Sequence, residues 1–369
     1  MNENASRHCD GVQEILSACE SALSFLRVQV ANIDGSLAHQ PDAPSTSVAA
    51  PEPQNSIFFQ SKSFYEFASL NIKIRKYRYA AYEAFFTSLQ ALTQRRFPNV
   101  RMYVHGSFQQ GTAITGSDLD ISFDCLNGAT YDLGNILVFV KENYRALNLN
   151  GTVEYIAARV PVIRLRADGD LFIDISSPGP RHLSRQAGSF IKVLMDARKD
   201  LNLYVCILKQ AFSQSRVYGG RRLALGGIGI TVLVAWVMQQ MNLLPFFDRF
   251  DAVAEELRPG SPSWKAYWNA HRVQSSDDEA ISDNAVRQRF AEILRRLIAT
   301  DLYYVFSLCG QYPRTILENG LVIFTPPNNA QNAANVVSKQ TRLNDLVPLM
   351  KHFLTEWIKD PYAFLIKIS

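Results

Sequence analysis

An aspartate pair downstream of a Gly-Ser turn is the part of this chain whose residue types could do chemistry. Gly106 and Ser107 follow an apolar run, and Asp118 and Asp120 open a second apolar run within residues 104–123. Side chains alternate between the two faces of a strand, so both carboxylates should point the same way. Neighbouring carboxylates resist joint ionisation, and a divalent cation such as Mg²⁺ between them removes that repulsion. Because the turn offers backbone N–H groups and a hydroxyl to a phosphate chain, the segment predicts a metal and triphosphate site.

These residues resemble the signature of the nucleotidyltransferase superfamily, in which a Gly-Ser pair precedes an Asp-x-Asp on the next strand. The Ser-Asp-Leu-Asp form at 117–120 is similar to that of the noncanonical poly(A) polymerases and terminal uridylyltransferases, within the DNA polymerase β-like superfamily. A lone Asp-x-Asp is often only polar alternation on an edge strand, but the Gly-Ser pair and a third acid favour a site here. The resemblance covers most of residues 60–360, and the layout is similar to the compact kinetoplastid RNA-editing uridylyltransferases.

A two-metal nucleotidyl transfer, which the resemblance implies, needs a third acidic ligand for the ion that activates the attacking hydroxyl. The candidates are Asp168, Asp170 and Asp174. Asp168 and Asp170 flank a turn glycine, where aspartate is common for local reasons. Asp174 lies within an apolar strand, where a carboxylate is unfavourable unless it is paired or bound to metal. We therefore expect Asp174 to join Asp118 and Asp120 as a catalytic and metal-binding residue; the alternative is an aspartate that caps a loop at a strand end.

The resemblance also implies which residues contact the nucleotide. They are Gly106, Ser107, Ser117, Ser189, Lys209, Gly227 and Ile228. Lys209 follows an apolar helical run and would reach the triphosphate, unless it is a surface lysine with a buried stem. The family's second basic residue, one helical turn further along, is replaced by Ser213, for which Arg216 could compensate. The family's ribose-contacting asparagine corresponds to Gly188, with Ser189 beside it.

The base-contacting residues give mixed indications. Leu-Gly-Gly-Ile at 225–228 stands where terminal uridylyltransferases carry a tyrosine that stacks on the base. It resembles conventional poly(A) polymerases, in which an aliphatic side chain helps to sandwich adenine, and the loop 321–342 resembles theirs too. Ile228 and the 325–335 loop should line the base pocket. The Ser-Asp-Leu-Asp form and the compact layout favour UTP as the substrate, and ATP is the alternative.

Composition, charge and cysteine spacing exclude several classes of protein. The net charge of +4 is mildly basic, which is compatible with a polyanionic partner. The five cysteines are widely spaced, without a CxxC or Cys/His cluster, so neither structural zinc nor a disulfide framework is expected. The apolar run 223–238 is shorter than the roughly 18 residues of a membrane span, so we expect no membrane partner. The N-terminus has neither a secretory signal nor a clear presequence, and the resemblance favours an intracellular, mitochondrial location.

Hydrophobic periodicity predicts an α+β fold, with a small mixed-sheet catalytic domain followed by a mainly helical nucleotide-recognition domain. Strands are expected at 100–105, 119–124 and 171–176, and a strand pair within 151–166. The chain is expected to begin with an N-terminal helix at 1–34 and a flexible linker at 35–60, followed by a helix at 61–97 that packs on the C-terminal domain. The catalytic domain is expected at 98–190. The helical domain is expected at 191–369, with a base-recognition loop and a possible insertion at 244–300.

The function that the residues and the resemblance imply is template-independent addition of nucleotides to the 3′ end of single-stranded RNA. UMP from UTP is the first choice, with Mg²⁺ or Mn²⁺ as cofactor. The alternatives are a poly(A) polymerase and a primer-independent cyclic-dinucleotide or oligoadenylate synthase. A catalytically dead scaffold subunit is a further class, and the complete acidic triad argues against it. No C-terminal zinc or RNA-recognition motif is visible, so RNA should bind in the catalytic cleft or through a partner, such as a recruiting protein complex.

Overall fold

The computed structural model describes most of the chain from residue 63 onwards. The described residues are 63–126, 131–149, 151–157, 160–167, 171–177, 183–215, 225–244, 282–300, 305–308, 321–324, 326, 333 and 341–369. The helix expected at 1–34 and the linker expected at 35–60 lie outside them. So do Asp168, Asp170 and Arg216, and the part of the expected insertion that covers 245–281.

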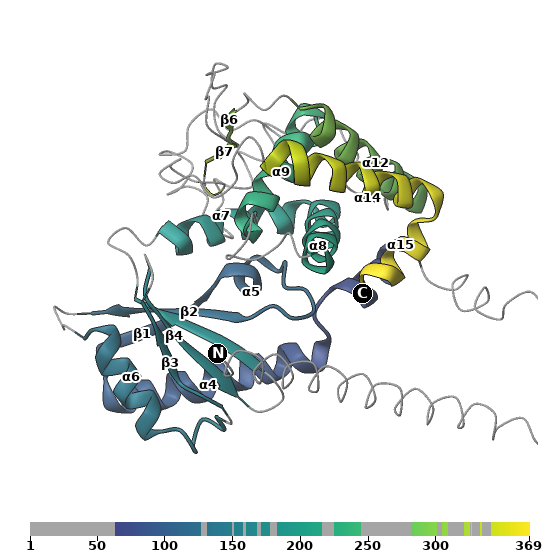
Figure 1. Ribbon diagram of the computed structural model, residues 1–369. Helices are drawn as coiled ribbons and strands as arrows, with labels where there is room; N and C mark the ends of the chain where they lie inside the picture. Colours follow the sequence, from purple (N-terminus) through teal and green to yellow (C-terminus); the bar gives the residue numbers. More distant parts are fainter. Residues whose placement is uncertain are drawn as a thin grey trace, which may run out of the picture. The chain divides into compact units, whose positions relative to one another are not determined.

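A five-stranded mixed sheet forms the first half of the described chain (Figure 1). Its order is β1-β2-β5-β4-β3, with β2 and β5 parallel and the other neighbours antiparallel. The strands are β1 Val100–His105, β2 Leu119–Cys125, β3 Glu154–Ile156, β4 Val162–Ala167 and β5 Leu171–Ser176. The sheet and its helices confirm the predicted α+β class, and β1 and β5 have the predicted bounds.

One face of the sheet is apolar and packs against two helices, α4 Lys76–Arg96 and α6 Leu133–Glu142. The alternating residues of the central strands, such as Ile121 and Ile173, are fully buried there. Asp132 caps α6 through a reciprocal pair of hydrogen bonds with Asn135. The opposite face is left for polar side chains, because side chains alternate along each strand.

The helical region expected at 61–97 is two helices with different neighbours. Helix α3, Phe64–Ile72, begins at a capping box and ends where Lys73 forms a β-bridge with Ile114. That bridge uses backbone groups that a continuous helix would need, so the helix breaks before α4. Helix α3 packs on the helical half, whereas α4, which we also expected there, packs on the sheet.

The second half is built around helix α8, whose side chains from Asp200 to Phe212 are buried. The elements around it are α7 Leu183–Ala197, α8 Lys199–Gln214, α9 Gly227–Gln240, α12 Asp283–Ala299, the π-helical turn η1 Arg342–Leu346, α14 Val347–Lys359 and α15 Pro361–Ile368. Two short parallel strands, β6 Val305–Phe306 and β7 Val322–Ile323, follow α12. Helix α12 contributes Phe290 and Leu294 to the shared core, so an insertion at this place does not extend through α12.

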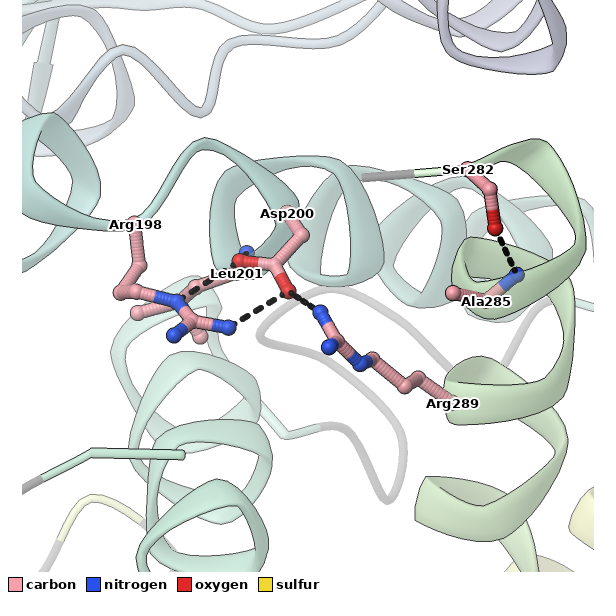
Figure 2. Close-up of polar contacts among 6 residues, drawn as sticks. All are labelled: Arg198, Asp200, Leu201, Ser282, Ala285 and Arg289. Carbon is pink, nitrogen blue, oxygen red and sulfur yellow. Dashed lines mark hydrogen bonds and ion pairs between the residues drawn. The ribbon is translucent and has the colours of Figure 1, made fainter. Parts of the chain in front are cut away.

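A buried ionic cluster fixes the start of α8 (Figure 2). Arg198 donates two hydrogen bonds to the carboxylate of Asp200, and Arg289 from α12 donates a third at 3.1 Å. The backbone N–H of Leu201 donates to the same carboxylate at 3.1 Å. The side chain of Asp200 is 2% exposed and that of Arg198 is 4% exposed. The cluster satisfies a buried charge and joins α8 to α12, which holds in place the helix that carries Lys209.

Two further expectations concern membranes and cysteines. None of the helices within the described residues is long and apolar enough to cross a membrane. Cys125 and Cys206, the cysteines in the described part of the chain, are free thiols.

Candidate active site

One cross-strand row carries an ionisable side chain on every strand of the sheet. The register pairs His105 with Asp120, Asp120 with Asp174, Asp174 with Arg164, and Arg164 with Glu154. Directly paired residues project to the same face of a sheet. The structure therefore brings Asp120 and the predicted third carboxylate, Asp174, side by side on the two central strands.

Burial and neighbouring carboxylates raise the pKa values of Asp118 and Asp120. Burial raises the pKa of Asp120 to about 8, and the carboxylates of Asp118 and Asp174 add to that rise. Burial also raises the pKa of Asp118, with Asp174 as the second cause. The positive charges of Lys209 and Arg164 lower both values. Positive charge favours the ionised forms of Asp118 and Asp120, so this pair of oxygen donors fits a divalent cation.

Gly106 makes room for one of these carboxylates. Its φ of +65° lies in the left-handed region, and a Cβ at this position would lie 2.0 Å from Oδ2 of Asp120. Glycine is therefore required for two independent reasons, its backbone conformation and the close approach of the carboxylate. Ser107 follows at the start of the short helix α5, Gly106–Gln110. The predicted Gly-Ser turn and the second aspartate thus lie in contact.

Ser117 shapes the turn that precedes the first aspartate. Its Oγ accepts the backbone N–H of Ile114 at 3.0 Å. Its carbonyl oxygen accepts the hydroxyl of Tyr82 at 3.0 Å, and that hydroxyl accepts the N–H of Phe172 at 3.2 Å. Tyr82 therefore ties the start of β2, and with it Asp118, to the start of β5. A nucleotide contact by Ser117 stays a prediction.

Arg164 holds both carboxylate oxygens of Asp174. Its Nε donates to Oδ1 at 2.8 Å and its Nη2 donates to Oδ2 at 2.7 Å. Among the described residues, no three His, Cys, Asp or Glu side chains are grouped so that they could hold a metal ion. The bidentate ion pair directs both oxygens of the Asp174 carboxylate to the side chain of Arg164 on β4. The sequence prediction missed Arg164, although its alternation with the buried Ile163 and Leu165 places it on the polar face.

Lys209 lies in the interior of the protein and not at its surface. Its side chain is fully buried, and its Nζ donates to the carbonyl oxygen of Thr112 at 2.8 Å. Burial lowers its pKa, and the carboxylates of Asp120 and Asp118 are among the groups that oppose that shift. This position excludes the alternative of a snorkelling surface lysine. It puts a positive charge close to the segment between Gly106 and Asp118.

The predicted ribose-contacting position is occupied by a neighbouring glutamine. A Cβ on Gly188 would lie 2.2 Å from Oε1 of Gln109, and the amide Nε2 of Gln109 donates to Oγ of Ser189 at 3.0 Å. Gln109 belongs to α5 and Ser189 to α7, so this hydrogen bond joins the Gly-Ser turn to the helical half. A nucleotide contact by Ser189 stays a prediction.

The start of α9 lies near the second part of the predicted base pocket. Helix α9 begins at Gly227, and Ile228 is half-buried against the helical core. A Cβ on Gly229 would lie 3.7 Å from the carbonyl oxygen of Ala333, whose N–H donates to Ile323 at 2.8 Å. The structure therefore brings Ile228 and the end of the 325–335 loop into one region. The rest of that loop, apart from Pro326, lies outside the described residues.

Comparison with known protein families identifies the central part of the chain. Residues 62–180, which include the whole carboxylate row, match the family described as "Poly(A) RNA polymerase, mitochondrial-like, central palm domain". No curated protein sequence matches the chain.

Several solved structures share the fold. The Cid1 poly(U) polymerase superposes with a TM-score of 0.62 at 16% identity, over 82% of this chain and 98% of that one. A cytoplasmic RNA terminal U-transferase gives 0.58 at 15% identity, with 82% and 98% covered. The GLD-2/RNP-8 complex gives 0.60 at 12% identity, with 82% and 96% covered. Residues 62–180 are therefore similar to the central palm domain of a mitochondrial-like poly(A) RNA polymerase, and the chain shares the fold of these poly(U) polymerase and terminal U-transferase structures.

Proposed function

We propose that the protein is a template-independent RNA nucleotidyltransferase, which transfers a nucleoside monophosphate from a triphosphate to the 3′ hydroxyl of single-stranded RNA. The observation that supports this proposal is the pairing of Asp120 with Asp174 across β2 and β5, with Asp120 against Gly106 and Asp118 two residues before Asp120. In the reaction the RNA oxygen bonds to the α phosphorus, and the bond to the β phosphate breaks to release pyrophosphate.

The chain's own residues divide this work between the two substrates. Asp118 and Asp120 would hold the cations, and Asp174 would join them on the side of the RNA hydroxyl. When bound, Mg²⁺ or Mn²⁺ supplies charge that neutralises the triphosphate and lowers the pKa of the attacking hydroxyl. The Gly106-Ser107 turn would bind the β and γ phosphates, and buried Lys209 contributes positive charge on the same side.

UTP is the substrate we propose first. The Ser-Asp-Leu-Asp form of the metal motif and the compact layout support UTP. ATP is the alternative, supported by Gly227 and Ile228 at the start of α9, where a stacking tyrosine is absent. The Cid1 and GLD-2 neighbours do not separate these possibilities at identities of 16% and 12%.

The proposal is tested with purified protein, a single-stranded RNA oligonucleotide and each nucleoside triphosphate separately. Addition of UMP to the RNA 3′ end is the expected result. Addition of AMP alone would show that the substrate is ATP and not UTP. A product formed without RNA would identify a primer-independent synthase. Failure to bind the magnesium–nucleotide complex would instead indicate a scaffold subunit.

The proposal also includes the setting of the enzyme. A recruiting protein partner is consistent with the neighbouring structure of GLD-2 in complex with RNP-8. A mitochondrial location and a role in RNA editing follow only from the resemblance of the sequence, and fractionation of cells that express the tagged protein would test the location.

A further inference from the structure

The order of the strands separates the two substrates of the proposed reaction. Gly106 and Ser107 follow β1, Gly106 lies against Asp120 on β2, and Lys209 is hydrogen-bonded to Thr112 in the segment that joins the two strands, so we assign the triphosphate to the side of β1 and β2. Asp174 lies on β5, and β4 is the next strand outward. An acceptor that reaches Asp174 without displacing the triphosphate must therefore approach over β5 and β4.

Those two strands present an aromatic ring and a guanidinium on the acceptor side. Phe172 pairs directly with Arg166 across β4 and β5, and the Cζ of Arg166 lies 5.3 Å from the centre of the phenyl ring. Phe172 precedes Asp174 by two residues, so both point to the same face. The intervening Ile173 is fully buried on the other face, whereas Phe172 is 39% exposed.

The position of Phe172 is fixed relative to the carboxylates. Its backbone N–H donates to the hydroxyl of Tyr82, which donates to the carbonyl oxygen of Ser117, the residue before Asp118. The alternative role of the Phe172–Arg166 pair is structural, because an arginine over an exposed phenylalanine ring is weakly stabilising. Here, however, the pair stands next to the carboxylate row and on the side where an acceptor has to lie. Arg164 continues the basic strip on the same strand, with a side chain 45% exposed.

We propose that Phe172, Arg166 and Arg164 form the docking surface for the last nucleotides of the single-stranded RNA acceptor. A base stacks on the ring of Phe172, and the guanidinium groups bind the adjacent phosphates, the combination of contacts that holds single strands without reading their sequence. This inference rests on the proposed function, because the acceptor side is defined by the transfer reaction.

One consequence concerns Asp174. An acceptor phosphate near β4 competes for the guanidinium of Arg164, which now makes both hydrogen bonds to the Asp174 carboxylate. Because Arg164 is far more exposed than Asp174, at 45% against 13%, the arginine can turn towards a phosphate while the carboxylate stays in place. Docking of the acceptor therefore frees Asp174 at the moment when its carboxylate is needed.

The test is binding of a fluorescent single-stranded RNA oligonucleotide to the full chain, measured by anisotropy in EDTA without nucleotide. Phe172→Ala should weaken binding roughly tenfold, the scale of one lost base stack. Phe172→Leu keeps the apolar bulk and should weaken binding similarly, which separates stacking from loss of folding. Arg166→Gln should weaken binding and reduce the slope of log K against log salt by about 0.7.

Two control variants match these changes away from the proposed surface. Tyr155→Ala removes an aromatic side chain that is 50% exposed on β3, opposite the buried Ile163. Arg145→Gln removes an exposed arginine that follows α6, the helix on the other face of the sheet. Both should bind as the wild type does.

The outcomes separate this inference from the proposed function. If the wild type adds nucleotides to RNA while the Phe172 and Arg166 variants bind it as tightly as the wild type, the docking surface is wrong and the function stands. If the wild type adds no nucleotide but loses RNA binding on Phe172→Ala, the surface stands and the function is wrong. A wild type that binds no RNA in EDTA overturns the docking surface.

Discussion

Arg164→Gln should increase the affinity of the free protein for Mn²⁺. The bidentate pair, at 2.8 and 2.7 Å, has to be broken before both oxygens of Asp174 can turn to a cation. Charge-assisted pairs of this geometry are among the strong hydrogen bonds, but the Arg164 side chain is 45% exposed. Solvent screening reduces the net value to about 1 kcal/mol, which corresponds to a roughly fivefold lower Kd.

The assay is a Mn²⁺ titration without nucleotide or RNA, followed by calorimetry or by the electron paramagnetic resonance signal of free Mn²⁺. Arg164→Lys is the informative partner variant, because it keeps the charge but cannot make both hydrogen bonds, and it should fall between the wild type and Arg164→Gln. Arg145→Gln, which removes a distant charge, should leave the Kd unchanged. An Arg164→Gln protein that binds Mn²⁺ no more tightly than the wild type would refute the competition for Asp174.

Three other predictions concern stability. The folded-state pKa of Asp120 is raised to about 8 from an ordinary 3.8, so the folded state retains a proton that the unfolded state loses. In EDTA the free energy of unfolding should therefore fall by up to about 2 kcal/mol between pH 6 and pH 8. This fall is measured by urea unfolding at the two pH values. It should be smaller in Asp120→Asn and smaller in the wild type when Mg²⁺ is present. Gly106→Ala should lower the thermal midpoint of unfolding more than Gly116→Ala. Both glycines have positive φ, but a Cβ at Gly106 would clash with Asp120, whereas nothing lies within 4 Å of a Cβ at Gly116. Equal shifts of the thermal midpoint would exclude the clash with Asp120 as a cause. Asp200→Ala should destabilise the protein by about 3–5 kcal/mol, since it removes the buried carboxylate that Arg198 and Arg289 share. Asp196→Ala on the exposed side of α7 should stay within about 0.5 kcal/mol; denaturant unfolding of both variants measures the difference.

The sequence was sufficient to predict the strands and the polar face of the sheet. Period-2 alternation is a local property, so Asp118 and Asp120 could be assigned to one face, and Asp174 could be predicted as the third acid because it lies within an apolar strand. Arg164 alternates in the same way, but its partner depends on the register of the β4–β5 hairpin. A shift of one residue would have paired it differently, and the length of that connection could not be determined from its Asp-Gly dipeptide.

Tertiary contacts explain what local sequence patterns could not predict. The break between α3 and α4 depends on the bridge from Lys73 to Ile114, which lies far along the chain. Helix α8 is buried on all sides, so a period of 3.6 residues gives no indication that Lys209 points inwards. Gly188 is packed against Gln109, which lies far from it in the sequence, so its role depends on a tertiary contact that no local pattern indicates.

The central claim is that residues from β2 and β5 form one metal-dependent transfer centre. It is tested most directly by measuring extension of a single-stranded RNA in Mg²⁺ by Asp118→Ala and Asp174→Asn, with Asp196→Ala as the control. We predict a loss of about 100-fold or more for the two site variants, on the scale of removing a group that stabilises the transition state. Their thermal unfolding should stay cooperative, and the control should be as active as the wild type. Undiminished extension by a folded Asp118→Ala or Asp174→Asn protein would contradict the account.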